Sequence, residues 1–279
     1  MRFKALIATL TLLAAALRTA GHSAEYGTEH PVSIITEEKG SRMDIFFRNR
    51  SAGSLTVTLY FTRFINARAN RPLPLTLTAP AGKITRALTV SQADPAKKWD
   101  TYFMYNYLFG SAEAVHRDDT LYHLPYRKGA AYTVVQGYDG RYTHKGEFRY
   151  SLDWGMPVGT EVLAAREGVV VEVVDRYDGH GLTNHYWDRN NLVSIEHPDG
   201  TVGRYVHFKK GGARVKAGQR VRAGDLIALS GNVGYSDTPH LHLSVYKPLD
   251  GKRMQSIPVR FRTAEGGVIL TEGKTYRAP

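Results

Sequence analysis

The sequence contains no cysteine. Disulfide bonds and thiolate metal ligands are therefore excluded, and any metal must be held by histidine and carboxylate side chains. The body of the chain has no run of eighteen apolar residues, which argues against an internal membrane span. We also find no amphipathic helical pattern longer than about two turns. Because 42% of the residues are hydrophobic and 11% are aromatic, the chain can still form a packed core.

Acidic residues are fewer than basic ones. The formal net charge is +11, and it falls to +8 without residues 1–24, which hold three basic residues and no acidic one. An excess of positive charge favours association with anionic polymers. Because the basic residues are scattered rather than clustered with aromatic residues, we do not expect nucleic acid as a partner.

The first residues have the pattern of a secretory signal. Arg2 and Lys4 precede an apolar stretch that is too short for a stable membrane span, and small residues follow it. We predict a signal peptide over residues 1–24 and cleavage after Gly21, Ser23 or Ala24. The mature protein would then be exported, without a membrane span. An uncleaved N-terminal anchor is the alternative.

The rest of the chain has the pattern of an all-β protein. Short segments rich in β-formers, such as residues 55–61, alternate with turns rich in Gly, Pro, Asn and Asp. We predict a β-sandwich-like accessory domain over residues 25–125. A mainly antiparallel β domain is expected over residues 126–262, followed by a tail over 263–279. The long connection 176–189 is expected to be a functional loop.

Two histidines flank one leucine in the segment His240-Leu241-His242. On a β-strand, residues two apart share a face, so both imidazoles are expected on one side and Leu241 on the other. One such histidine can bind a metal while its neighbour handles protons. Asp153 and His207, each in a β-rich segment, are further candidates. Tyr205 is expected on the same face as His207, where it would contact a substrate or pack in the core.

In this order, these residues resemble the lysostaphin-type (LytM-like) zinc endopeptidases that cut peptidoglycan cross-links. The family pattern runs from H-x-x-x-D through P-x-G-T-x-V-x-A and Y-x-H to a final P-H-L-H. The matching segments are residues 152–153, 157–164, 205–207, 215–224 and 231–242. The resemblance covers about residues 130–248 and implies a β fold of the duplicated-hybrid-motif type.

The resemblance also implies roles for individual residues. Asp153 and His242 would be zinc ligands. His207 and His240 would lie outside the ligand set as an acid–base pair. One would accept a proton from the zinc-bound water, and the other would stabilise the oxyanion or protonate the leaving amine.

The third ligand departs from the pattern, because Arg149 stands where the family has its first histidine. A guanidinium cannot ligate zinc. We predict that His144, further upstream, reaches the metal from a bulged loop, with His180, His185 and His197 as other candidates. His197 precedes a turn signal and is expected at a turn edge. Arg149 would face away or contact a substrate carboxylate.

These features predict an exported, periplasmic or extracellular zinc endopeptidase that hydrolyses amide bonds in peptidoglycan stem peptides or cross-bridges. The other interpretation is a catalytically degenerate domain that binds peptidoglycan or activates a cell-wall amidase partner. His207, His240, Asp153 and His242 favour the enzyme, and Arg149 favours the alternative.

Overall fold

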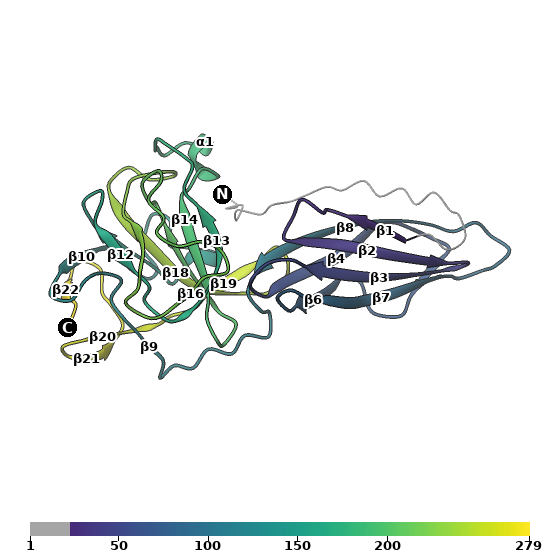
Figure 1. The fold of residues 1–279 in the computed structure, drawn as a ribbon, viewed down its shortest axis with the longest axis horizontal. Helices are drawn as coiled ribbons and strands as arrows, with labels where there is room; N and C mark the ends of the chain where they lie inside the picture. The colour runs from purple at the N-terminus through teal and green to yellow at the C-terminus, as the bar shows by residue number, and fades with distance from the viewer. Residues whose placement is uncertain (1–22) are drawn as a thin grey trace. The chain divides into compact units, whose positions relative to one another are not determined.

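The computed structural model describes residues 23–279 (Figure 1). The predicted signal peptide lies outside the described residues, except for Ser23 and Ala24, which begin the first strand. The described chain divides into two units. The N-terminal unit comprises the residues up to Ala112 together with 248–253, and the C-terminal unit comprises 113–247 and 254–279.

The N-terminal unit is built from eight strands. They are β1 (Ser23–Tyr26), β2 (Val32–Lys39), β3 (Arg42–Asn49), β4 (Leu55–Ile65), β5 (Ala67–Ala69), β6 (Leu75–Ala79), β7 (Ile84–Gln92) and β8 (Asp100–Phe109). They form two antiparallel sheets, with the strand orders β1-β2-β3-β7-β5 and β6-β4-β8. Alternate residues of both sheets are buried in one shared apolar cluster that includes Ile34, Ile45, Val57 and Leu59. The unit is therefore a small β-sandwich.

The C-terminal unit holds the remaining strands and two single-turn helices. The strands are β9 (Leu121–Tyr122), β10 (Ala131–Gln136), β11 (Ser151–Gly155), β12 (Glu161–Leu163), β13 (Gly168–Val174), β14 (Leu192–Glu196), β15 (Val202–Val206), β16 (Arg220–Val221), β17 (Leu226–Leu229), β18 (His240–Pro248), β19 (Met254–Ser256), β20 (Arg260–Thr263), β21 (Gly266–Val268) and β22 (Thr275–Arg277). The helices are the 3-10 helix η1 (Gly146–Phe148) and α1 (Asn184–Trp187).

Most strands of this unit belong to one sheet with the order β16-β13-β14-β15-β18-β11-β10-β22, and β19 also pairs with β18. Two small sheets, β12-β17 and β21-β20-β9, complete the unit, and β20 with β9 is its one parallel pair among the described strands. The all-β, mainly antiparallel class predicted from the sequence is confirmed. The segment 263–279, expected as a tail, contains β22, which extends the large sheet by pairing with β10.

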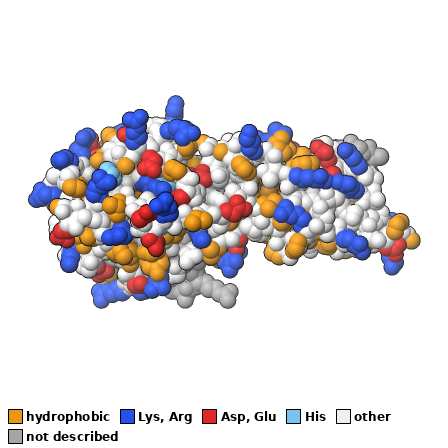
Figure 2. All heavy atoms as spheres, turned by 90° about the horizontal axis from the view of Figure 1, so that it is seen from below, with side chains coloured by type: hydrophobic (Ala, Val, Ile, Leu, Met, Phe, Trp, Pro, Cys, Tyr) orange, Lys and Arg blue, Asp and Glu red, His pale blue; other side chains and the backbone are white. Residues whose placement is uncertain are grey.

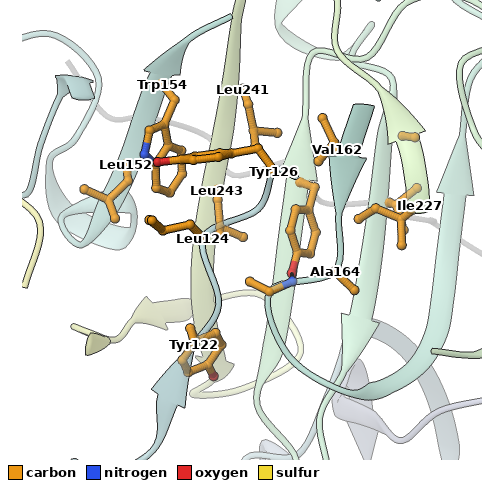
Figure 3. Close-up of a cluster of buried hydrophobic side chains, with 14 of the residues drawn as sticks. Tyr122, Leu124, Tyr126, Leu152, Trp154, Val162, Ala164, Ile227, Leu241 and Leu243 are labelled. Carbon is orange, nitrogen blue, oxygen red and sulfur yellow. Dashed lines mark hydrogen bonds between the residues drawn. The ribbon is translucent and has the colours of Figure 1, made fainter. Parts of the chain in front are cut away.

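Two strands at the centre of the large sheet place their apolar residues in the core and their polar residues on the opposite face. Leu152 and Trp154 of β11, together with Leu241 and Leu243 of β18, are almost fully buried in the cluster drawn in Figure 3. Burial of each such side chain stabilises the fold by roughly 1.5–3 kcal/mol. The core therefore fixes the two strands. The side chains that alternate with these apolar residues, such as Asp153 and His242, then point to the opposite face of the sheet.

The face seen in Figure 2 carries charged side chains of both signs, with apolar side chains scattered among them. Between residues 23 and 279, no helix combines the length and the apolar character that crossing a membrane requires.

Candidate metal centre

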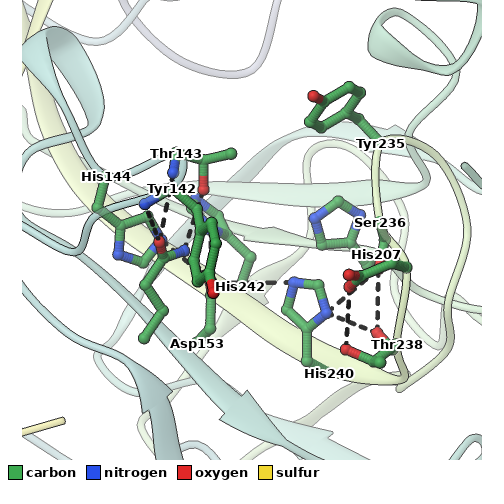
Figure 4. Close-up of polar contacts among 12 residues, drawn as sticks. Tyr142, Thr143, His144, Asp153, His207, Tyr235, Ser236, Thr238, His240 and His242 are labelled. Carbon is green, nitrogen blue, oxygen red and sulfur yellow. Dashed lines mark hydrogen bonds and ion pairs between the residues drawn. The ribbon is translucent and has the colours of Figure 1, made fainter. Parts of the chain in front are cut away.

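The predicted strand parity holds for the two histidines of β18. Leu241 is fully buried, whereas His240 and His242 lie on the other face of the strand, as Figure 4 shows. Strand β11 is the antiparallel neighbour of β18, and its register places Asp153 directly opposite His242. Directly opposed residues on one face of a sheet have side chains close enough to interact. Accordingly, His242 Nδ1 lies 2.8 Å from Asp153 Oδ1.

His144 joins this pair from the loop that connects β10 to β11. Its side chain is fully buried, and its Nε2 lies 3.2 Å from Asp153 Oδ2. The rings of His144 and His242 are 5.3 Å apart, centroid to centroid. One ligand atom from each of His144, Asp153 and His242 lies within 4.8 Å of the others. The loop thus brings together the three residues that the sequence suggested as ligands, although position 149 holds an arginine.

The ring of His144 is oriented by the backbone. Its Nδ1 lies 2.8 Å from the carbonyl oxygen of Gly137. A carbonyl can only accept, so Nδ1 carries the proton, and in the neutral ring the lone pair is on Nε2. That Nε2 is buried without a hydrogen-bond partner. A histidine held in this way is typical of a metal ligand, and two histidines with one carboxylate form a suitable donor set for zinc. The residues present therefore fit the ion.

Neighbouring charges and burial shift the pKa values of Asp153, His144 and His242 in opposite directions. Burial alone would raise the pKa of Asp153, but the charge of His242 and the nearby ring of His144 outweigh it, so this pKa lies well below the usual range. Burial lowers the pKa of His144, but Asp153 outweighs that effect and raises it. For His242 burial prevails, and the pKa is lowered. Asp153 is therefore an anion throughout the neutral range.

Gln136, at the end of β10, contributes contacts that sequence reasoning missed. Its Nε2 donates to Asp153 Oδ2 at 2.8 Å and to Thr143 Oγ1 at 3.0 Å. Its Oε1 accepts from the backbone N–H groups of Tyr142 and Thr143. One buried amide therefore links the carboxylate to the residues just before His144. The sequence offers only a weak signal for it, a polar residue at the end of a predicted strand.

The loop has a further support from the C-terminal segment. The backbone N–H of Gly137 donates to Glu272 Oε2 at 3.0 Å, and Gly273 N–H donates to the carbonyl of Val134. Gly140 also lies so close to Gln136 that a Cβ at this glycine would be 2.4 Å from Gln136 Cγ. Glycine is required there because no larger residue leaves the amide in place.

His207 and His240 lie beside the cluster. The centroid of the His207 ring is 4.6 Å from that of His240 and 6.0 Å from that of His242. His207 Nδ1 is 2.9 Å from the carbonyl of Val233, and His240 Nδ1 is 2.8 Å from the carbonyl of Thr238. Each ring therefore uses Nδ1 as a donor. Burial, followed by the neighbouring His240, lowers the pKa of His207 well below its usual value.

The expectation that Tyr205 and His207 share a face is wrong. Strand β15 ends at Val206, and His207 adopts a left-handed backbone conformation with φ of 72°. The side chain of Tyr205 is fully buried in the core, and its hydroxyl accepts a hydrogen bond from the N–H of Ala165 at 2.8 Å. This residue therefore packs in the core and presents no surface to a substrate.

The other candidates lie apart from the three-residue cluster. Arg149 Nε donates to Asp139 Oδ1 at 2.8 Å, and its side chain is half exposed. His180 is exposed, with Nδ1 3.2 Å from the carbonyl of Ser236, and His185 is exposed on α1. His197 lies at its predicted turn but is buried, which lowers its pKa to about 4.

This centre of two histidines and a carboxylate, with two further histidines beside it, has the composition of a metal-dependent hydrolase site. Residues 147–256 match the description Peptidase family M23. This match supports the resemblance of this part of the chain to the lysostaphin-type, LytM-like metallopeptidases.

Known relatives align with the same half of the chain. Glycyl-glycine endopeptidase ALE-1 of Staphylococcus capitis is 39% identical over 97 residues, which are 35% of this chain and 24% of that protein. Peptidoglycan DD-endopeptidase ShyA of Vibrio cholerae is 33% identical over 121 residues, 42% of this chain and 25% of that protein. The chain thus spans about a quarter of the length of these relatives.

Among solved structures, the catalytic domain of lysostaphin from Staphylococcus simulans is 28% identical. The match covers 47% of this chain and 88% of that chain, with a TM-score of 0.32.

Proposed function

We propose that this protein is a zinc-dependent endopeptidase that hydrolyses amide bonds in peptidoglycan stem peptides or cross-bridges. The observation that carries the proposal is the convergence of His144, Asp153 and His242 within a domain of family M23. Relatives named as a peptidoglycan DD-endopeptidase and a glycyl-glycine endopeptidase support the substrate class.

In this proposal, His144, Asp153 and His242 hold the zinc ion. Zinc bound by three protein ligands would lower the pKa of a bound water toward about 7 and would polarise the scissile carbonyl. Asp153 supplies the negative charge of the ligand set. Gln136 and the carbonyl of Gly137 would orient two of these ligands, because Gln136 bonds to Asp153 Oδ2 and the carbonyl bonds to His144 Nδ1.

His207 and His240 move protons in this proposal. Since the Nδ1 atom of each ring is bonded to a backbone carbonyl, Nε2 is the atom left to exchange a proton with the reacting groups. One histidine accepts a proton from the attacking water. The other, once protonated, donates to the amine that leaves. Their ring centroids, 4.6 Å apart, allow both to serve one scissile bond.

Arg149 is proposed to contact a carboxylate of the substrate. Together with Lys145 and Ser256 it lines a pocket of about 480 Å³ beside η1. A planar guanidinium binds a carboxylate through two parallel hydrogen bonds. The existing ion pair with Asp139 would hold the guanidinium ready for that contact.

We further propose that the protein is exported and meets peptidoglycan in the periplasm or outside the cell. Two observations support this location. Residues 1–24 have the pattern of a signal peptide, and the relatives are named as a peptidoglycan DD-endopeptidase and a glycyl-glycine endopeptidase. The alternative, a degenerate domain that binds peptidoglycan or activates an amidase, is favoured only by the arginine at position 149.

Zinc content and wall digestion together test the proposal. Elemental analysis of purified protein, dialysed against a weak chelator, is expected to give about one zinc per chain. Purified sacculi should release peptide fragments with free amino termini, and protein stripped by a strong chelator should regain this activity when zinc is restored. Folded protein with zinc well below half occupancy, or zinc-loaded protein without any release, would leave the degenerate domain as the better description.

A further inference from the structure

The N-terminal sandwich has a pocket of about 430 Å³ on the outer face of its five-stranded sheet. Three arginines from separate parts of the chain line it. Arg42 belongs to β3, Arg86 to β7, and Arg71 to the loop that follows β5. Figure 2 shows Lys and Arg side chains along the visible face of this unit, on the right of the view.

Asp44 is the carboxylate in contact with this group, and it is already fully engaged. Arg42 Nη2 lies 3.0 Å from Asp44 Oδ1 and 3.1 Å from Oδ2, and Arg86 Nη2 lies 2.7 Å from Oδ1. The hydroxyl of Thr89 donates to the same Oδ1. The side chain of Asp44 is only 13% exposed, whereas those of Arg42 and Arg86 are 51% and 54% exposed. The negative group is covered, and the positive groups face the solvent.

Arg71 adds a charge that Asp44 does not balance. Its Nη1 donates to the neutral carbonyl oxygen of Ala87 at 3.0 Å. The loop is fixed beside β7, because Asn70 N–H donates to the carbonyl of Thr89 and Thr89 N–H donates to Asn70 Oδ1. Three guanidiniums against one carboxylate leave a surplus of two positive charges around the pocket.

The strand register places further basic residues beside the pocket and so enlarges the surplus of positive charge. Lys39 lies opposite Arg42, Arg42 opposite Ser91, and Ser91 opposite Arg68, so three basic residues lie in one row across four strands. Glu37 and Asp44 are paired in the next row of the same face. The pocket therefore lies at the edge of a positively charged surface.

We propose that this pocket binds a phosphate group. Guanidiniums recognise phosphate through paired N–H donors, and a surplus of two charges suits a dianion. Asp44 already shows how a carboxylate with two oxygens is held, by two of the arginines and the hydroxyl of Thr89. A phosphate offers more oxygens, which three guanidiniums from three directions can reach together. The volume leaves room for the group that carries the phosphate, so it can be a phospholipid headgroup or a soluble phosphate ester.

The test uses the full chain, stripped of metal so that the zinc centre plays no part. Binding of inorganic phosphate and pyrophosphate is measured by calorimetry at low ionic strength. The double variant Arg71→Gln/Arg86→Gln is expected to bind at least about tenfold more weakly. The control Arg63→Gln removes an exposed arginine of the same unit that is paired with Asp100, and it should bind within about twofold of the unaltered protein.

Equal loss of binding in the double variant and in the control would overturn the pocket, because net charge alone would then explain the binding. Equal affinity for acetate or succinate would overturn the choice of phosphate. If circular dichroism shows that the double variant is unfolded, Arg71→Gln alone decides, since Arg71 contacts no carboxylate.

A second experiment distinguishes a phospholipid headgroup from a soluble phosphate ester. It compares binding to vesicles of phosphatidylglycerol with phosphatidylcholine and to vesicles of phosphatidylcholine alone. Arginine-dependent binding to the former assigns a lipid headgroup, and phosphate binding without vesicle binding assigns a soluble ester.

Discussion

Asp44 in the N-terminal unit and Asp153 in the C-terminal unit each lie among several basic side chains, and these partners differ in kind. Asp44 in the N-terminal unit is held by two arginines and a threonine at the surface. Asp153 in the C-terminal unit is held by two histidines and a glutamine in the interior. In both places the pKa of the carboxyl group is lowered, to about 2 for Asp44. Burial would raise the pKa in both places, but the hydrogen bonds of Thr89 and the arginines outweigh it at Asp44, and the charge of His242 is the largest opposing effect at Asp153.

The difference between the partners decides what each site can bind. Arginine remains charged and has no lone pair to offer, so the group around Asp44 can attract an anion but not hold a metal. Neutral histidine carries a lone pair, so the group around Asp153 can hold a cation. A carboxylate surrounded by basic side chains is thus part of an anion site in one unit and of a cation site in the other. The predictions below test the histidine side of this comparison, and the pH prediction tests both sides together.

The largest effect is expected from His144→Ala. Removal of one of three ligands should weaken zinc binding by more than about a hundredfold and abolish wall hydrolysis with it. Arg149→Ala is the matched control on the same loop, because Arg149 contacts Asp139 rather than the cluster, and it should keep its zinc. Zinc stoichiometry after dialysis, in variants with unaltered circular dichroism, is the measurement. Full zinc retention in His144→Ala would instead direct attention to His180 or His185.

His240→Ala should separate catalysis from metal binding. His240 lies beside the cluster, with Nε2 4.0 Å from Asp153 Oδ1, and is not needed to close it. We expect the variant to keep its zinc and to lose about a hundredfold in the rate of fragment release from sacculi. A rate within a few-fold of the unaltered protein would show that His240 transfers no proton in the reaction.

Gln136→Met should have a smaller effect on the metal. The change keeps the length of the side chain but removes the donor to Asp153 and the acceptor for the loop. Loss of a partner of this kind typically weakens metal binding by about 10–100-fold. Competition with a chelating dye measures the affinity, and Gln255→Met, at an exposed position of β19, is the control. Identical zinc affinities in the two variants would show that the amide does not position the ligands.

The smallest effect concerns the pH at which each unit loses stability. The pKa of His197 is lowered from about 6.5 unfolded to about 4 folded, so its stabilising contribution is present above about pH 6.5 and is lost as the pH falls toward 4. For Asp44, whose folded pKa is about 2, the corresponding loss begins only below about pH 4. In metal-free protein, hydrogen exchange should therefore show the C-terminal unit weakening first, by of order 1 kcal/mol. His197→Asn should reduce that loss, and an unchanged pH profile in this variant would contradict the assignment.

Local patterns of the sequence predicted the strands and the direction of several side chains. The alternation around Leu241 correctly placed His240 and His242 on one face, because a period of two is a property of the strand itself. The same rule failed for Tyr205 and His207, because the strand ends between them and the backbone turns left-handed at His207. Such an ending depends on tertiary contacts, here the bond of His207 to Val233, which alternation does not reveal.

Contacts between distant segments were harder to predict. That Asp153 is directly opposite His242 depends on the register of two strands separated by most of the C-terminal unit. Gln136 acquires its role through a register shift in β10, which pairs it with Asp153. The arginine pocket combines β3, β7 and a loop residue, none of which forms a motif alone. The sequence therefore identified which residues can do chemistry, but much less about what holds them in place.

The pairing of β22 with β10 links the candidate metal centre to the order in which the chain is synthesised. Glu272 and the strand that follows it are synthesised after His144, Asp153 and His242. Until they emerge, Gly137 lacks the carboxylate that accepts its N–H, and β10 lacks its outer neighbour. The loop that carries His144 thus gains its last support only when translation has passed every candidate ligand. A growing chain would accordingly bind metal less firmly than the finished protein.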